Sequence, residues 1–389
     1  MTEQIPRPAA TESGGDLFKC IALVLQGGGA LGSYQAGVYE ALAEANIHPD
    51  WVAGISIGSI NSALIAGNPP EKRVEKLREF WETVTEPPLG PFGLPYNPHA
   101  KHINENLHRA LNQFRAFGAA ALGATGFFKP RVPSPLVWPE HNPSALGYYD
   151  VSPLKSTLER LVDFDRINSG ATRLSVGAVN VRTGNFTYFD TKTHRIDFRH
   201  IMASGSLPPG FPATEIDGEF YWDGGIVSNT PLQWVLESHP RRDTLTFQVD
   251  LWSATGDLPR DLAEVETRQK DIQYSSRTRE ATHQVINMQR LRRIFRRVYE
   301  HLPEEIRALP EVEYLAKESN ESVYNIVHLI YHAKSYEGVV KDFEFSRRTM
   351  EEHWSAGYSA ARKALGHPEV LRRPHNREGF CVFDFSHEA

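Results

Sequence analysis

The sequence predicts an α/β protein built on a mainly parallel central sheet. Two apolar runs, residues 21–26 (IALVLQ) and 51–55 (WVAGI), have the length and composition of buried strands. Each is followed by a segment with helical spacing of apolar or small residues, at 33–46 and 58–66. Strand, helix, strand and helix with short connections are typical of βαβ units, which form parallel sheets.

This regular pattern is interrupted at residues 87–148, which contain many prolines and glycines and the apolar, small-residue stretch 117–128 (FGAAALGATGFF). We predict an irregular insertion there. One interpretation is a surface excursion packed on the body of the protein. The other is a lid or an apolar entrance for the substrate, because long irregular insertions near a site often carry function.

Regular structure is expected again from residue 149 onwards. Ser152 and Pro153 predict the start of a helix that runs to about Val162. The other expected elements, in chain order, are strands at 174–181 and 186–190 around a hairpin turn at 182–185, a helix at 198–204, strands at 219–222 and 245–251, a helix at 290–300, a strand at 324–331 and a helix at 346–365. We therefore expect a disordered tail at 1–20, a main unit at 21–236, and a mostly helical C-terminal extension at 237–389 that packs on the same core.

The bulk properties exclude several classes of function. The 389 residues carry a net charge of −6, so no basic excess indicates nucleic-acid binding. The two cysteines, Cys20 and Cys381, do not form a disulfide framework and fit a reducing compartment. We see no secretion signal and no apolar run of the roughly 18 residues that a membrane span requires. The expected location is cytoplasmic or peripheral to a membrane.

Ser56 lies in the pattern Gly54-Ile55-Ser56-Ile57-Gly58, between a predicted strand and a predicted helix. G-x-S-x-G in this position is the sharp turn that presents a nucleophilic serine, and its glycines avoid steric clashes in the strained backbone. The start of the next helix favours the negative charge that develops during the reaction. The alternative is a serine that only caps the helix.

A glycine-rich loop, Gly27-Gly28-Gly29-Ala30-Leu31-Gly32, follows the first strand. Its backbone N–H groups could hold an oxyanion. It also satisfies G-x-G-x-x-G, the dinucleotide fingerprint, which requires an acidic residue about 20 positions on, at the end of the second strand. Asp50 precedes that strand and Ser56 occupies its end, so the nucleotide interpretation is disfavoured. A purely structural glycine turn is the third interpretation. The candidate oxyanion donors are the N–H groups of Gly27, Gly28, Gly29 and Ala30.

A serine nucleophile needs a proton acceptor. His194, His200, His239 and His283 follow Ser56, but none lies in a suggestive setting. Asp223 ends an aromatic strand and precedes Gly224 and Gly225, which allow close backbone approach. A buried carboxylate can serve as the base if its pKa is raised. A turn-forming Asp before glycine is the alternative.

These three segments, taken in order, resemble the patatin-like phospholipase family, which shares G-G-G-x-x-G, G-x-S-x-G and D-G-G or D-G-A. Residues 203–209 and 225–231 also look like the core of that family, and the resemblance covers about residues 21–236. It implies a three-layer α/β/α fold, lipid acyl hydrolysis through an acyl-enzyme, and a Ser–Asp dyad without histidine. By this resemblance, Ser56 is the expected nucleophile and Asp223 is the expected proton acceptor. The resemblance also makes Gly32, Gly54, Gly58, Gly224 and Gly225 motif glycines.

The chain departs from that family at Leu31, where many members carry Lys or Arg. This leaves room for neutral or short-chain esters as substrates. No metal or organic cofactor is implied. One rival function is acyl transfer on a related fold, in which a histidine precedes the elbow serine; here that residue is Ile55. The other rival is a non-catalytic module that binds lipid or protein.

A basic segment at 286–300 is the remaining candidate for a partner contact. Its apolar residues are Leu291, Ile294, Phe295 and Val298, and its arginines are Arg290, Arg292, Arg293, Arg296 and Arg297. One interpretation is a helix that contacts an anionic membrane surface. The other is a packed helix whose arginines pair with Glu304, Glu305, Glu311 and Glu313.

Overall fold

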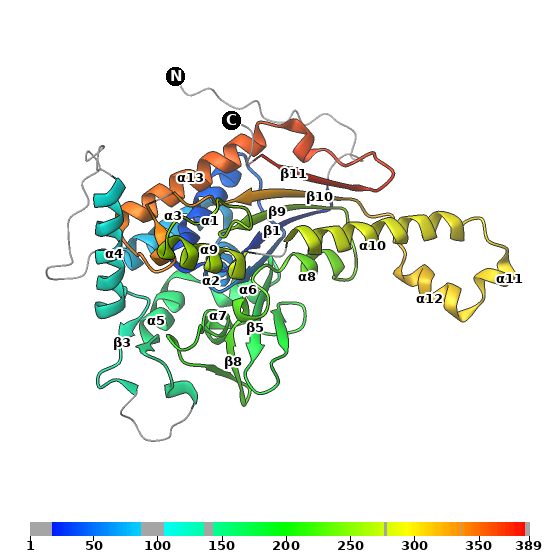
Figure 1. Ribbon diagram of the computed structural model, residues 1–389. Coiled ribbons are helices and arrows are strands. Elements are labelled where there is room, and N and C mark those ends of the chain that lie inside the picture. Colours follow the sequence, from blue (N-terminus) through cyan, green and yellow to red (C-terminus); the bar gives the residue numbers. More distant parts are fainter. Residues whose placement is uncertain (1–17, 87–104, 136–142, 276–277, 335, 386–389) are drawn as a thin grey trace.

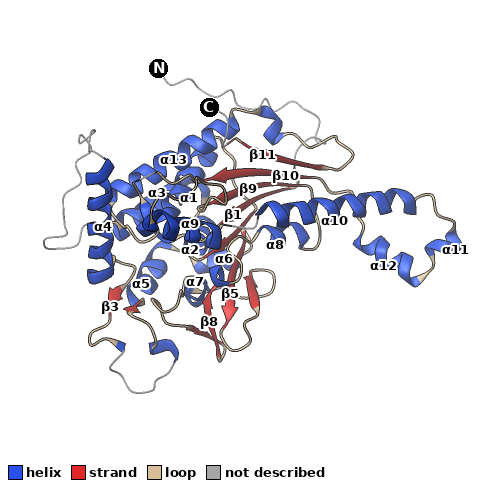
Figure 2. Ribbon diagram, viewed as in Figure 1, coloured by secondary structure: helices blue, strands red, loops and turns tan. Residues whose placement is uncertain are grey.

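A nine-stranded sheet lies at the centre of the molecule, with helices on both faces (Figures 1 and 2). The computed structural model describes residues 18–86, 105–135, 143–275, 278–334 and 336–385. The strands of this sheet are β1 (Cys20–Leu25), β2 (Trp51–Ile55), β5 (Arg173–Asn180), β6 (Phe186–Asp190), β7 (Thr214–Ile216), β8 (Glu219–Asp223), β9 (Thr244–Asp250), β10 (Tyr324–Ile330) and β11 (Phe380–Asp384). Their order is β11-β10-β9-β1-β2-β5-β8-β7, with β6 paired to β5.

The sheet is mainly parallel, because the strands from β11 to β5 all run in the same direction. The pairs β5–β6, β5–β8 and β7–β8 are antiparallel. The first two predicted strands and the 186–190 strand agree with the structure to within one residue. β7 and β11 have no counterpart in the prediction, because three to five residues are too few to show a reliable alternation.

The two strands β1 and β2 are almost wholly apolar because both faces of the sheet are covered there. In β1, Leu23 and Leu25 belong to the large core beneath one face, whereas Ala22 and Val24 belong to a smaller core on the other. The smaller core is closed by Leu232 and other residues of α8 (Leu232–Glu237), and by α10 (Thr278–Tyr299). Helix, sheet and helix thus form three layers, as the resemblance implied.

The remaining helices lie on or around the large core and in the C-terminal part of the chain. They are α1 (Ser33–Glu44), α2 (Ile57–Ala66), α3 (Pro70–Val84), α4 (Glu105–Leu122), α5 (Ser152–Leu161), α6 (Phe164–Asn168), α7 (Phe198–Ser204), α9 (Leu262–Tyr274), α11 (Glu304–Arg307), α12 (Pro310–Glu318) and α13 (Arg347–Leu365). A two-stranded ribbon, β3 (Lys129–Pro130) with β4 (Tyr149–Asp150), lies apart from the main sheet.

α1 and α13 pack with their backbones in contact. A β-carbon added to Gly37 would lie 1.9 Å from the carbonyl oxygen of Trp354, and one added to Gly357 would lie 1.9 Å from that of Tyr34. Both glycines are therefore required for this close approach.

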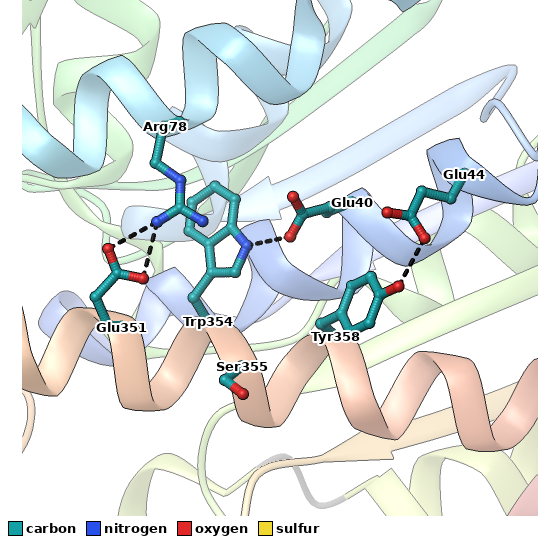
Figure 3. Close-up of a pocket in the computed structure, with 7 residues that line it drawn as sticks. All are labelled: Glu40, Glu44, Arg78, Glu351, Trp354, Ser355 and Tyr358. Atoms are coloured by element: carbon teal, nitrogen blue, oxygen red, sulfur yellow. Dashed lines mark hydrogen bonds and ion pairs between the residues drawn. The ribbon is translucent and has the colours of Figure 1, made fainter. Parts of the chain in front are cut away.

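A surface pocket of about 290 Å³ lies beside the α1–α13 contact (Figure 3). Arg78 of α3 binds both carboxylate oxygens of Glu351 at 2.9 Å, and its guanidinium stacks 3.9 Å from the centre of the Trp354 ring. Trp354 Nε1 donates to Glu40, and the Tyr358 hydroxyl donates to Glu44. The pocket contains none of the predicted site residues, and the carboxylates that line it already accept hydrogen bonds from α3 and α13.

The insertion contains more regular structure than the sequence predicted. Residues 105–122 form α4, and this helix includes the first half of the apolar stretch 117–128. The helix lacks proline, but the surrounding prolines and glycines dominate the composition of the segment. Phe127 and Phe128 are buried in the large core, so this part of the insertion packs on the body. Residues 87–104 and 136–142, and therefore much of the proposed lid, lie outside the described residues, as does most of the predicted tail.

Residues after 236 contribute β9, β10 and β11 to one side of the sheet, next to β1. α10 begins against the smaller core, where Val285 is buried, and then extends away from the sheet, with α11 and α12 at its far end (yellow in Figure 1). We call residues 287–318 the helical arm. Among the described helices, none combines the length and the apolar character that a membrane crossing would need.

Candidate active site

Ser56 lies on a strained turn between β2 and α2. Its φ of 54° is in the left-handed region that side chains other than glycine rarely adopt. The turn is tight: a β-carbon on Gly54 would lie 2.2 Å from the Gly58 carbonyl oxygen, and one on Gly58 would lie 2.3 Å from that of Leu25. Such strain persists only where the surroundings enforce it, and it is common at active sites. The half-buried Ser56 side chain is thus presented at the end of β2.

The pairing of the strands brings Asp223 to Ser56. β2 runs parallel to β5, and its last residue, Ile55, lies opposite Gly177. β8 runs antiparallel to β5, and its last residue, Asp223, lies opposite Ala178. β5 has two edges, and β6 pairs along one of them. β2 and β8 therefore both pair along the other edge of β5, one after the other, and their C-terminal ends meet there. The residue after Ile55 therefore lies beside Asp223.

Burial gives the Asp223 carboxylate an unusual basicity. The side chain is 2% exposed, and desolvation raises the pKa of Asp223 to about 6. Interaction with the Ser56 hydroxyl and a hydrogen bond of 2.7 Å from the Gly225 N–H to Oδ1 oppose this rise. The group is ionised at neutral pH and is a stronger base than an ordinary aspartate. This arrangement can take a proton from a serine hydroxyl.

The glycine loop passes close to the serine, since a β-carbon on Gly27 would lie 3.0 Å from the Cβ of Ser56. Two of the four predicted oxyanion donors already donate hydrogen bonds to carbonyl groups of the protein. The Gly27 N–H donates to the Asn229 carbonyl at 3.4 Å, and the Ala30 N–H donates to the Asp342 carbonyl at 2.7 Å. In the described part of the chain, no acceptor contacts the N–H groups of Gly28 and Gly29. The candidate donors are therefore narrowed to these two amides.

One further candidate donor was missed by the sequence analysis. Ile57 follows the elbow serine and is the first residue of α2, so its N–H has no acceptor within the helix. In serine hydrolases with this kind of elbow, the residue after the nucleophile supplies one oxyanion donor. The position could have been inferred from the motif alone.

Three side chains hold the glycine loop in place, and two of them, Asn229 and Trp252, come from much later in the chain. Asn229 Nδ2 donates to the Gly27 carbonyl at 3.1 Å and to the Tyr274 carbonyl at 2.8 Å. Trp252 Nε1 donates to the same Gly27 carbonyl at 2.8 Å. Gln26 accepts from the backbone N–H groups of Leu251 and Trp252 at 2.6 and 3.0 Å. The only sequence signal for these contacts was the 225–231 stretch, which contains Asn229.

A buried polar network supports the loop from the other side. Gln35 donates to the Gln26 carbonyl at 2.6 Å, Asn61 donates to the Gln35 side chain and to the Gly32 carbonyl, and Trp81 donates to Asn61. Buried polar groups of this kind fix a single geometry because leaving any of them unpaired is costly. The loop is therefore held rigidly before any substrate arrives.

The histidines considered as alternative bases have other contacts. His200 shares a capping box with Asp197 at the start of α7. His194 contacts Thr193, and His239 lies 3.9 Å from Glu318. The side chain of His283 lies outside the described residues. Within the described residues, no group of three or more His, Cys, Asp and Glu side chains is arranged to hold a metal ion.

Comparison with known proteins gives two family matches. A family described as patatin-like phospholipase matches residues 23–235, and one described as patatin phospholipase matches residues 272–377. A 73-residue segment is 44% identical to patatin-like phospholipase domain-containing protein 6 of Mus musculus, and it covers 18% of this chain and 5% of that protein. A 48-residue segment is 52% identical to lysophospholipase nte1 of Aspergillus terreus, with coverages of 12% and 3%. The matched segments thus span about a twentieth or less of these relatives.

Among solved structures, VipD from Legionella pneumophila aligns with 95% of this chain and 72% of its own, at 14% identity and a TM-score of 0.40.

Proposed function

Since this chain belongs to the patatin-like phospholipase family, we propose that it is a serine acyl hydrolase that cleaves acyl esters of lipids. The observation that carries the proposal is the meeting of the β2 and β8 ends, which sets Ser56 beside a buried carboxylate of raised pKa. A vestigial site would not need to keep both a strained serine and a buried acid, since each costs stability.

In the proposed reaction, Ser56 Oγ attacks the ester carbonyl carbon while Asp223 accepts the hydroxyl proton. The N–H groups of Gly28, Gly29 and Ile57 stabilise the negative charge on the carbonyl oxygen. The carbon–oxygen bond to the alcohol then breaks, and the proton passes from Asp223 to the leaving oxygen. An acyl-enzyme remains. Asp223 next activates water, which releases the acid and restores Ser56.

The surroundings of the site support an apolar acyl substrate. Ile226 and Val227 directly follow the Asp-Gly-Gly turn and are 46% and 57% exposed. Leu31 is fully buried, so the position at which many relatives carry a cation offers no charge to a head group here. We propose that acyl-chain contacts, rather than a charged contact at residue 31, select the substrate.

A fluorophosphonate probe tests the nucleophile, because it reacts covalently with activated serines. We expect stoichiometric labelling of the parent protein and none of Ser56→Ala. Ser228→Ala, a neighbouring serine outside the dyad, serves as the matched control and should label as the parent does. Absence of labelling in the folded parent protein, or persistence in Ser56→Ala, would support a binding module or a different nucleophile.

We further propose that the helical arm contacts an anionic membrane surface. Leu291, Ile294 and Val298 form one strip along α10 and are 61%, 48% and 49% exposed, so this apolar face is not packed against the body. Arg290 and Arg297 are exposed and, by helical spacing, border the same strip. Within the described chain, no ion pair joins the five arginines to the acidic residues 304, 305, 311 and 313; Arg296 pairs with Glu300 instead. The ion pairs that the packed alternative predicts are therefore not seen there, although Arg293 donates to the Glu321 carbonyl at 2.6 Å.

Liposome flotation tests this contact. Arg290→Glu/Arg297→Glu should bind phosphatidylglycerol-containing vesicles at least about tenfold more weakly than the parent, since each basic residue near such a surface contributes about 1 kcal/mol. The matched control, Arg182→Glu/Arg195→Glu, changes two exposed arginines elsewhere and should bind as the parent does. Equal binding of the parent to neutral and anionic vesicles would contradict the proposal.

A further inference from the structure

Tyr274 is fixed beside the glycine loop by its own backbone. It is the last residue of α9, and its carbonyl oxygen accepts hydrogen bonds from Asn229 Nδ2 at 2.8 Å and Gln26 Nε2 at 3.2 Å. The same Asn229 amide also binds the Gly27 carbonyl, and Gly27 lies next to Ser56. A residue of the C-terminal part of the chain is thus positioned at the edge of the site.

The side chain of Tyr274 is held as well. Its ring lies 5.3 Å from the ring of Trp252, whose indole N–H binds the Gly27 carbonyl. The residue is half-buried, and its hydroxyl finds no hydrogen-bond partner among the described residues. Burial, and then the negative charges of Asp342 and Asp223, raise the pKa of Tyr274, so its hydroxyl stays protonated at neutral pH. The contacts from its ring through Trp252 to Gly27 place this residue beside the loop that borders Ser56.

We propose that the Tyr274 hydroxyl donates a hydrogen bond to the alcohol oxygen that leaves during acylation, a role that rests on the proposed Ser56–Asp223 hydrolase. As the carbon–oxygen bond breaks, negative charge develops on that oxygen. Tyr274 stabilises this charge and keeps its own proton. The proton that Asp223 took from Ser56 passes to the leaving oxygen, so the alcohol departs neutral and Asp223 is ionised again.

A site with a single carboxylate base has a specific need for such a donor. Asp223 must be basic enough to deprotonate serine and acidic enough to protonate an alkoxide, which are opposing demands on one pKa. A separate neutral donor at the leaving oxygen relieves this conflict. Its benefit depends on the leaving group, because an alkoxide needs this stabilisation and a nitrophenolate does not.

The test is Tyr274→Phe, which keeps the ring, the Trp252 contact and both backbone hydrogen bonds. Two esters with the same acyl chain are compared, one of a simple alkyl alcohol and one of p-nitrophenol. We expect kcat/KM for the alkyl ester to fall by about 100-fold, at the lower end of the range for a positioned proton donor. For the nitrophenyl ester we expect a change of less than about twofold, because nitrophenolate leaves unaided.

Tyr358→Phe, which removes a hydroxyl that binds Glu44 beside the surface pocket of α1 and α13, is the control and should leave both rates unchanged. Equal losses on the two esters would show that Tyr274 only positions the loop, and no loss on either would show that it is a bystander; each result overturns the proposal. Failure of the hydrolase assignment is separately visible, because Ser56→Ala would then retain turnover of both esters.

Discussion

An Asp223→Asn enzyme should fold like its parent and lose about three to four orders of magnitude in kcat/KM. Asparagine has the same shape, and its Oδ1 can still accept the Gly225 N–H that is bonded at 2.7 Å in the parent. It cannot accept a proton, so the Ser56 hydroxyl remains a poor nucleophile. Ester hydrolysis by the purified variant measures the loss. Retained turnover would assign the base role to a histidine.

The same raised pKa predicts the pH dependence of activity. Because Asp223 must be ionised to act as a base, kcat/KM of the parent should fall as the pH decreases through about 6. Asp217→Asn, in the exposed turn between β7 and β8, is the matched control and should keep both the rate and the pH profile of the parent. An acidic limb near the ordinary aspartate value of 3.8 would show that burial does not tune the base.

Stability should change in the opposite direction to activity. The pKa of Asp223 is raised from 3.8 to about 6 in the folded protein, so ionisation of this group opposes folding. This cost is absent below about pH 4, grows as the pH rises, and reaches about 3 kcal/mol above pH 6. The unfolding free energy of Asp223→Asn, relative to the parent, should therefore rise by up to that amount between pH 4 and pH 8. Urea titrations at the two pH values measure it.

Gly357→Ala should destabilise the protein by about 3 kcal/mol or more. In an ordinary helix this substitution stabilises by up to about 1 kcal/mol. Here the new β-carbon would lie 1.9 Å from the Tyr34 carbonyl oxygen, and backbone cannot move aside as a flexible side chain can. α1 and α13 must therefore separate, which also disturbs the hydrogen bonds of Trp354 and Tyr358 to α1 (Figure 3).

Urea unfolding of Gly357→Ala and Ser355→Ala makes the comparison. Ser355 lies on the exposed side of the same helix, so its substitution should change stability by only a few tenths of a kcal/mol. A Gly357→Ala protein as stable as the parent would mean that α1 and α13 are farther apart than described. Because α1 starts directly after the glycine loop, we also expect the folded fraction of the variant to show reduced activity.

The parts of the fold that depend on local pattern could be predicted from the sequence. β1, α1, β2 and α2 follow from apolar runs and helical spacing, and Ser56 follows from the glycines around it. α4 was missed because the composition of the whole insertion concealed its own periodicity. The sequence shows no local sign of the antiparallel β5–β8 pairing, which brings Asp223 to Ser56 from 167 positions away along the chain.

Details of the site that depend on tertiary contacts were not predictable. The Ala30 N–H looks free in the sequence, but Asp342, which lies far downstream, supplies its acceptor. Gln26, Gln35 and Asn61 look like ordinary polar residues, yet they form the buried network that supports the loop. Such contacts involve single side chains at large sequence separation, so no periodicity or motif reveals them.

The supports of the glycine loop have a consequence for protein synthesis. Ser56 and Asp223 are both made before residue 224 is added, but the carbonyl that holds Ala30 belongs to Asp342, and α13 follows still later. A nascent chain that already contains both Ser56 and Asp223 therefore still lacks the contacts that fix the glycine loop, whose N–H groups would bind the oxyanion. We expect hydrolytic competence to arise only after Asp342 and α13 have been synthesised, so that a shorter nascent chain holds an inactive centre.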